Sequence, residues 1–274
     1  PEHQIRNIET FGEDYQRRLS EITLGVVGCG GIGNPFCEIA RRMGFRKFVL
    51  VDHDLVEEKN RNRLLGCGAE WNGKPKVDLC QHLLRSFDSD TEVVAVAGVH
   101  ESERAYNALV DADILISCVD SDEARLGLMS YAARTLKPLF DTGTGLRFGD
   151  DKCLLEKGSR LRVYVPGQAG LFCQGLDMNA IMSESLKAAR RSVGYVDGPS
   201  DVEVPGRVIS LNAAIAAMTA DILADYVNGR QLAHNTLICD MFNKNLKKYS
   251  FSRLDGCMLC GSCEGLGIQA VMPV

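Results

Sequence analysis

The chain has 274 residues, of which 45% are hydrophobic and 24% are charged, and this is the composition of an ordinary enzyme with one large core. Its formal net charge of -5 argues against a nucleic-acid partner, because binding to a phosphate backbone needs clustered lysine and arginine. No apolar run is long enough to span a bilayer, and the chain opens without the basic and apolar segments of a signal peptide. We therefore expect a cytoplasmic protein without membrane contact, whose eleven cysteines are reduced and mostly buried.

A strand-helix-strand unit is predicted near the start of the chain. Residues 4–20 suggest short helical pieces, and the apolar, β-branched run at 22–27 is too short for a helix, which indicates a buried parallel strand. An amphipathic helix is expected over residues 34–43. A second buried strand is expected over residues 47–51, and it ends in Asp52.

The same alternation continues as far as residue 141. Further strands are expected over 92–97, 113–119 and 138–141, and further helices over 76–87, 102–110 and 123–134. This repeat is typical of a Rossmann-like, doubly wound α/β fold with a mostly parallel sheet.

The rest of the chain is expected to extend this sheet, so that residues 1–274 form a single domain. Short β runs at 152–155 and 161–165 suggest antiparallel strands, and a long crossover is predicted over 167–207. An apolar helix that ends near Tyr226 is expected next. The predicted segments that remain are a polar helix at 178–192 inside the crossover, β runs over 236–251 and a cysteine-rich tail over 253–274.

A glycine cluster lies where the first strand turns into the first long helix. Glycines at this place let backbone N–H groups approach phosphate at a helix N-terminus, and Asp52 at the end of the next strand suits a ribose hydroxyl. Nicotinamide-dependent oxidoreductases use the same device, and a tight packing turn is the structural alternative. The glycines concerned are Gly28, Gly30, Gly31 and Gly33.

The residues that follow Asp52 favour ATP over a nicotinamide cofactor. Asn60, Arg63 and Lys76 supply an amide and two cations, which a triphosphate needs. Near the end of the fourth strand, Asp120 offers the kind of carboxylate that Mg²⁺ prefers beside phosphate oxygens. The structural alternatives are a solvated surface pair for Arg63 and Lys76, and a cap of the helix that begins near Ser121 for Asp120.

Four motifs in order resemble those of the ubiquitin-activating-like (ThiF/MoeB-type) adenylyltransferases, which include compact activators of ubiquitin-like modifiers and of sulfur-carrier proteins. The resemblance covers nearly the whole chain, from an N-terminal R-x-I-like segment to the tail. The motif positions are Gly28 to Gly33; Asp52, Asp54, Val56, Asn60 and Arg63; Gly73 and Lys76; and Cys118, Val119 and Asp120 with Arg125.

This resemblance implies an ATP- and Mg-dependent enzyme that adenylates the C-terminal carboxylate of a ubiquitin-like or sulfur-carrier protein ending in Gly, and that releases pyrophosphate. Asp52 would hold the ribose, while Asn60, Arg63 and Lys76 would grip the phosphates and Asp120 would place Mg²⁺. Arg6 would reach the neighbouring site of a homodimer, although an arginine near a chain end is usually exposed and mobile. Arg125 would hold structure.

The cysteines depart from the family pattern. The resemblance implies a structural zinc held by two Cys-x-x-Cys pairs, of which only Cys257 and Cys260 remain intact; Cys173 and Cys263 complete a set of four. The alternative is a vestigial or redox-labile cluster. No cysteine precedes Pro205, where family members that form thioesters carry their nucleophile. Either the reaction stops at the acyl-adenylate, or another thiol, first of all Cys173, forms a thioester and a conjugating enzyme is a further partner.

Three other interpretations stay open from the sequence. The acceptor is a peptide C-terminus or a tRNA-linked carboxylate; the chain is an NAD-dependent oxidoreductase; or it is a scaffold without activity, against which the presence of Arg63, Lys76 and Asp120 argues.

Overall fold

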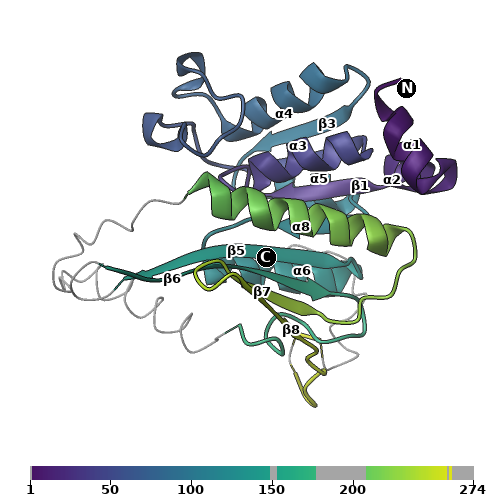
Figure 1. The fold of residues 1–274 in the computed structure, drawn as a ribbon, viewed down its shortest axis with the longest axis vertical. Helices are drawn as coiled ribbons and strands as arrows, with labels where there is room; N and C mark the ends of the chain where they lie inside the picture. The colour runs from purple at the N-terminus through teal and green to yellow at the C-terminus, as the bar shows by residue number, and fades with distance from the viewer. Residues whose placement is uncertain (1, 149–152, 177–207, 258, 261–274) are drawn as a thin grey trace.

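A computed structural model describes residues 2–148, 153–176, 208–257, 259 and 260 (Figure 1). In this part of the chain the strands form one eight-stranded sheet in the order β3-β2-β1-β4-β5-β6-β7-β8. The pairs from β3 to β5 are parallel, and those from β5 to β8 are antiparallel. The strands are β1 (Thr23–Val27), β2 (Lys47–Asp52), β3 (Glu92–Ala97), β4 (Ile114–Ser117), β5 (Leu139–Phe148), β6 (Leu154–Tyr164), β7 (Thr236–Asp240) and β8 (Asn245–Tyr249).

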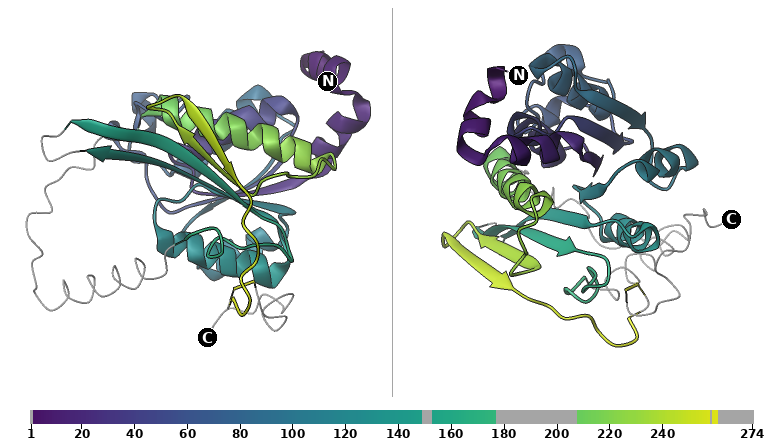
Figure 2. Two further views of the ribbon diagram at one scale, coloured as in Figure 1. Left: turned by 60° about the horizontal axis from the view of Figure 1, so that its bottom comes forward. Right: turned by 90° about the vertical axis from the view of Figure 1, so that its right-hand side faces the viewer.

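Helices cover both faces of the sheet, as the turned views in Figure 2 show. One hydrophobic core lies between the sheet and α3 (Gly33–Met43), α4 (Lys76–Phe87) and α8 (Ile209–Val227). A second core lies on the opposite face, under α5 (Glu103–Val110) and α6 (Asp122–Thr135). These features confirm the predicted Rossmann-like α/β fold with its antiparallel extension.

The N-terminal segment packs beside the end of α8, where α1 (Ile5–Phe11) and α2 (Glu13–Glu21) form a bent pair (Figure 1). Short 3-10 turns cover Glu2–Gln4, Glu58–Asn60 and Ala69–Trp71. Among the described helices, none combines the length and the apolar content needed to cross a bilayer.

The strand predicted over 138–141 is longer than the sequence indicates, because β5 continues to Phe148 in a ladder with β6. The added residues include alternating threonine and glycine, which give no apolar periodicity. The predicted helix at 178–192 and most of the predicted crossover lie outside the described residues.

Candidate functional site

A cavity of about 1140 Å³ opens at the ends of the parallel strands and continues along the antiparallel half of the sheet. Crevices beyond the carboxyl ends of strands are the usual ligand sites of open α/β sheets. At one end it is lined by Gly28, Gly30 and Gly31 of the β1–α3 loop, and towards the other by Arg160 of β6 and Lys247 of β8. The lining also includes Asp52, Lys76 and Asp120.

The glycine loop is closely packed at Gly28 and Gly33. Gly28 has φ +93, and a Cβ there would lie 2.7 Å from the Cys118 carbonyl oxygen; at Gly33 it would lie 1.8 Å from the Gly28 carbonyl oxygen. At Gly30, by contrast, a Cβ would meet nothing within 4 Å. Helix α3 begins at Gly33 without a side-chain cap, but its Asn34 N–H donates to the Gly30 carbonyl at 3.0 Å and Pro35 has no N–H. Amide donors for an anion therefore come from the glycine loop before the helix rather than from its first turn.

Asp52 fastens this loop to the end of β2. Its Oδ2 accepts a hydrogen bond from the Cys29 N–H at 2.6 Å, and its Oδ1 accepts one from the Asp54 N–H at 2.8 Å. Burial raises the pKa of Asp52, while these backbone donors and the charge of Lys76 oppose the rise. The predicted ribose ligand therefore also positions the loop, and its ribose role stays a prediction.

Lys76 and Asp120 bring opposite charges to the cavity. Lys76 is the first residue of α4, and its Nζ lies 2.6 Å from Oδ2 of the half-exposed Asp54. Asp120 follows β4 and lines the cavity. The alternative that Asp120 caps α6 is wrong, because the Ser121 side chain is the cap and accepts a hydrogen bond from the Ala124 N–H at 3.2 Å.

The other predicted site residues are not part of the cavity lining. Asn60 is 2% exposed, and its Oδ1 accepts a hydrogen bond from the Glu57 N–H at 3.4 Å in a capping box. Arg63 donates to the Lys59 carbonyl at 3.0 Å, yet its Cδ would lie only 3.1 Å from a Cβ on Gly31. Arg6 is exposed on α1. Phosphate contacts by Asn60 and Arg63, and the reach of Arg6 into a partner site, stay predictions.

A buried charged cluster on the cavity side of β5 and β6 was missed by the sequence analysis. Asp141 is fully buried, and its Oδ1 accepts hydrogen bonds from Ser117 Oγ at 2.7 Å and from Arg125 Nε at 3.2 Å. Arg125 also donates to the Val119 carbonyl at 2.7 Å, which agrees with the structural role expected for it. Arg160 and Arg162 complete the cluster. The alternation of arginine with leucine and valine over 160–163 is the signal that places both on one strand face.

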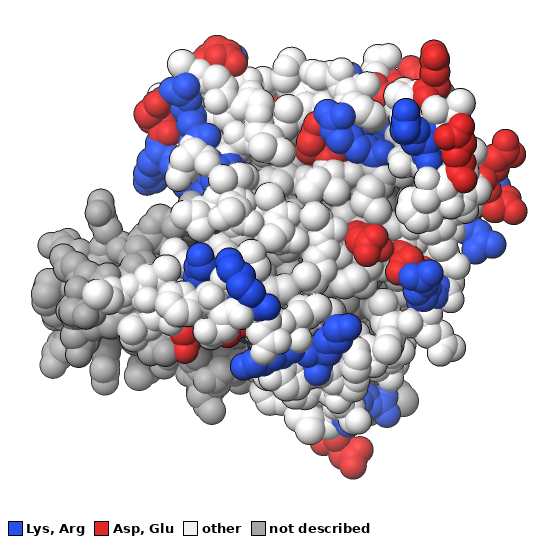
Figure 3. Space-filling model, in the orientation of Figure 1, with Lys and Arg blue, Asp and Glu red and all other residues white. Residues whose placement is uncertain are grey.

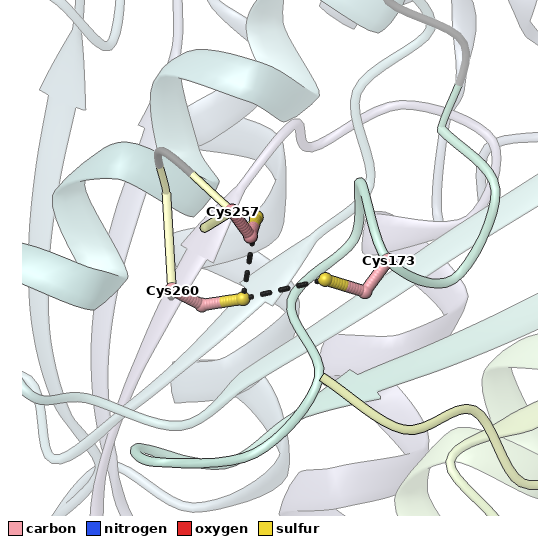
Figure 4. A group of neighbouring side chains, drawn as sticks. All are labelled: Cys173, Cys257 and Cys260. Atoms are coloured by element: carbon pink, nitrogen blue, oxygen red, sulfur yellow. Dashed lines mark hydrogen bonds between the residues drawn. The ribbon is translucent and has the colours of Figure 1, made fainter. Parts of the chain in front are cut away.

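Three of the four predicted zinc ligands, Cys173, Cys257 and Cys260, lie together in the core on the α6 side of the sheet (Figure 4). Their sulfur atoms all lie within 4.8 Å of one another, with 3.5 Å from Cys260 to Cys173 and 3.5 Å from Cys260 to Cys257. Four thiolates around Zn²⁺ lie about 3.8 Å apart, given Zn–S bonds of about 2.3 Å. The three buried thiols therefore fit part of a zinc site, while Cys263 lies outside the described residues.

Comparisons with known proteins agree with this architecture. A model of the ThiF family matches residues 2–258. The ubiquitin-like modifier-activating enzyme 5 of Gallus gallus is 30% identical over 128 residues, which cover 42% of this chain and 32% of that protein. The adenylyltransferase and sulfurtransferase MOCS3 of Mus musculus is 30% identical over 138 residues, covering 50% of this chain and 30% of that protein. The matches thus span about a third of these relatives' own length.

Among solved structures, the crystal structure of E. coli MccB with ATP has a TM-score of 0.70 and 19% sequence identity. The match covers 95% of this chain and 75% of that one, so the fold is shared over almost the whole sequence.

Proposed function

Because the chain belongs to the ThiF family, whose relatives include proteins named as activating enzymes and adenylyltransferases, we propose that it transfers AMP from ATP to a C-terminal carboxylate. A carboxylate oxygen of the acceptor attacks the α-phosphorus, the bond between the α- and β-phosphates breaks, and pyrophosphate leaves. The acceptor is a ubiquitin-like or sulfur-carrier protein that ends in glycine.

The observation that carries the proposal is the meeting of a glycine loop, a cation and a carboxylate in one cavity. Glycine-loop amides and the N-terminus of α3 favour the negative charge of phosphates. Lys76 lines the same cavity, and its ammonium can neutralise charge that builds up on the α-phosphate during attack. Asp120 is the residue that would hold Mg²⁺, which when bound shields the phosphate oxygens.

The second half of the cavity supports an extended acceptor tail. Gly143 and Gly145 of β5 and Gly158 of β6 line it. A Cβ on Gly145 would meet nothing within 4 Å, whereas one on Gly143 would lie 3.2 Å from Arg125 Nη2 and one on Gly158 would lie 2.9 Å from the Cys239 carbonyl oxygen, so the open space is at Gly145. Backbone without side chains leaves room for a narrow chain to lie against the sheet. An acceptor that ends in small residues suits this surface.

The test is acceptor-dependent exchange of labelled pyrophosphate into ATP. We expect Asp120→Ala to slow the exchange about 100-fold or more, as loss of a group that organises transition-state charge does. Asp122→Ala is the matched control, because Asp122 lies two residues away, is absent from the cavity lining and pairs with Arg125 in a 42% exposed position. Equal rates in both variants would remove Asp120 from the site.

The same preparation separates the competing interpretations. Stabilisation of the fold by ATP with Mg²⁺ supports the proposal, whereas stabilisation by NAD alone would point to an oxidoreductase. Exchange that requires an intact glycine-ended carrier protein supports the proposed acceptor. Exchange with a short peptide or a tRNA instead would keep adenylation and change the acceptor, and a complete lack of exchange with every acceptor would favour a scaffold.

We further propose that Cys173, Cys257, Cys260 and Cys263 hold a structural zinc. Cys173 and Cys260 are buried against each other, and the Gly170 N–H donates to the Cys260 sulfur at 3.3 Å, so these thiols face inward. A nucleophile must meet its acyl group, so this burial supports a reaction that stops at the acyl-adenylate rather than a thioester on Cys173. The enzyme is proposed to act as a homodimer.

A further inference from the structure

The half of the cavity proposed to take the acceptor tail has a charged floor, formed by Asp141 of β5 and by Arg160 and Arg162 of β6. The strand register defines where these three residues lie relative to one another. Asp141 pairs with Arg162 across β5 and β6, and Gly143 pairs with Arg160. Successive residues along β6 point to opposite faces of the sheet. Leu161 and Val163 pack in the core under α8, so Arg160 and Arg162 lie on the opposite face. They therefore share that face with the carboxylate of Asp141.

Positive charge in this floor is not balanced within the described residues. Both hydrogen bonds that Asp141 accepts, from Arg125 and Ser117, go to its Oδ1, and its buried Oδ2 has no hydrogen-bond partner in the described part of the chain. No described carboxylate forms an ion pair with Arg160 or Arg162, so the cluster sets three arginines against the two carboxylates of Asp141 and Asp122. Three buried guanidinium nitrogens have no hydrogen-bond partner there: Nε of Arg160, and Nε and Nη1 of Arg162. Arg162 is only 3% exposed. Burial lowers the pKa of both arginines, in the case of Arg162 to about 10.

Surplus positive charge in a buried cluster is costly, and buried donors in proteins are nearly always paired. Arg160 can reach a partner from the cavity, because it lines the cavity between Gly143 on β5 and the neighbouring strand β7. Arg160, Ile238 and Lys247 form a row across β6, β7 and β8, because Arg160 pairs with Ile238 and Ile238 pairs with Lys247. Lys247 lines the cavity as well.

This row is too far along the sheet to serve the nucleotide phosphates. Three strand spacings separate β6 from β1, whose end carries the glycine loop, which is roughly 14 Å at about 4.8 Å per spacing. An extended peptide rises about 3.4 Å per residue, so it covers this distance in about four residues. A chain whose terminal carboxylate reaches the glycine-loop end would thus pass a side chain over Arg160.

We propose that Arg160, supported by Arg162 and flanked by Lys247, binds the side-chain carboxylate of an aspartate or glutamate about four residues before the C-terminus of the acceptor. The inference rests on the proposed function, and it narrows the acceptor to tails that carry an acidic residue there. A guanidinium is well suited to this task, because it donates two parallel hydrogen bonds to one carboxylate.

The experiment measures direct binding of labelled hexapeptides that end in Gly-Gly, without ATP. Each peptide carries one Glu at a different position, and each has a Gln twin. We expect one Glu peptide, with the acidic residue about four positions from the end, to bind about tenfold tighter than its twin. In Arg160→Gln this ratio falls to about one, and Arg160→Lys retains part of it.

Lys248→Gln is the matched control, because Lys248 neighbours Lys247 in β8 but belongs to the α8 side of the sheet with its partner Leu237. Lysines and arginines gather over the β7–β8 end on that side too, as Figure 3 shows, so the control removes a similar charge from the other face. We expect Lys248→Gln to keep the ratio of Glu-peptide to Gln-peptide affinity. We expect Lys247→Gln to lower this ratio only about twofold to threefold, because Lys247 is exposed. Should Arg160→Gln fail to fold, Arg160→Lys and Lys247→Gln carry the test.

A ratio near one for the unmodified protein at every position, or an unchanged ratio in Arg160→Gln, overturns the inference. Absence of binding by every peptide overturns it too. Pyrophosphate exchange is measured separately on the same variants. If the protein prefers the Glu peptide but catalyses no exchange, the acidic subsite stands and the proposed adenylation is wrong. If it catalyses exchange but shows no preference for Glu, adenylation stands and the subsite is wrong.

Discussion

Replacing Lys76 with methionine separates a phosphate ligand from a surface ion pair. In the structure the Lys76 Nζ lies 2.6 Å from Asp54 Oδ2, and the Lys76 side chain is 10% exposed while that of Asp54 is 51% exposed. A pair with one half-exposed partner contributes about 1 kcal/mol or less to stability. Methionine keeps the apolar stem that α4 buries, so the free energy of unfolding should fall by no more than about 1 kcal/mol.

The effect on adenylation should be much larger. A cation that meets charge developing on the α-phosphate contributes about 2.7–4 kcal/mol to the transition state, so removing it slows pyrophosphate exchange about 100-fold to 1000-fold. The control is Lys74→Met, two residues away. Lys74 is exposed, does not line the cavity and stands over the Trp71 ring at 5.0 Å, a contact worth about 0.5–1 kcal/mol.

Urea unfolding and exchange rates on the same samples give both quantities. We expect the two variants to lose similar stability and only Lys76→Met to lose exchange. If Lys76→Met exchanges as fast as Lys74→Met, the lysine is a surface residue and the proposed phosphate site is wrong. If it loses several kcal/mol of stability, its ion pair with Asp54 has been underestimated and the rate says nothing about phosphate.

Two further predictions concern the cysteine cluster and the dimer. We expect elemental analysis of the purified protein to find about one equivalent of zinc, and we expect Cys260→Ser to lose it. Cys153→Ser should keep the zinc, because Cys153 is exposed and remote in sequence from the cluster. If both variants hold equal zinc, or if the unmodified protein holds none, the three thiols do not form a zinc site. If Arg6 acts across a homodimer, the Arg6→Ala and Lys76→Met variants are each inactive alone. A re-equilibrated mixture of the two recovers about one quarter of the unmodified activity, because half of the dimers are then mixed and each mixed dimer holds one complete site out of two. A mixture that stays inactive would mean that Arg6 acts within its own subunit or has no part in the reaction.

The architecture was predictable because buried parallel strands leave a strong sequence signal. The apolar runs that became β1 and β2, and the amphipathic run that became α3, differ from the predicted bounds by about one residue. The outer part of β5 was not predictable in this way. Gly143 to Gly145 lines the cavity rather than a core, so it has polar and glycine residues where a buried strand has apolar ones.

Residue order predicted which groups come near the glycine loop, but not how their side chains are used. Asp52 was expected as a ribose ligand, and spacing could not show that both of its oxygens already accept backbone N–H groups. Asn60 likewise stands in the motif, yet its buried side chain closes a capping box. These hydrogen bonds depend on the path of the backbone after β1 and after β2, which motif spacing does not define.

The arginines of β6 show a different limit. In sequence, Arg160-Leu161-Arg162-Val163 is the pattern of a half-buried strand whose polar side chains face water. That interpretation fails because the face opposite α8 also receives α6 and the segment 169–176, where the Gly175 carbonyl accepts from Arg162 Nη2 at 3.0 Å. A second layer turns an ordinary surface pattern into buried charge. Since such charge is tolerated only when it finds a partner, the residues that sequence alone would dismiss as solvated are those from which the acceptor preference is inferred.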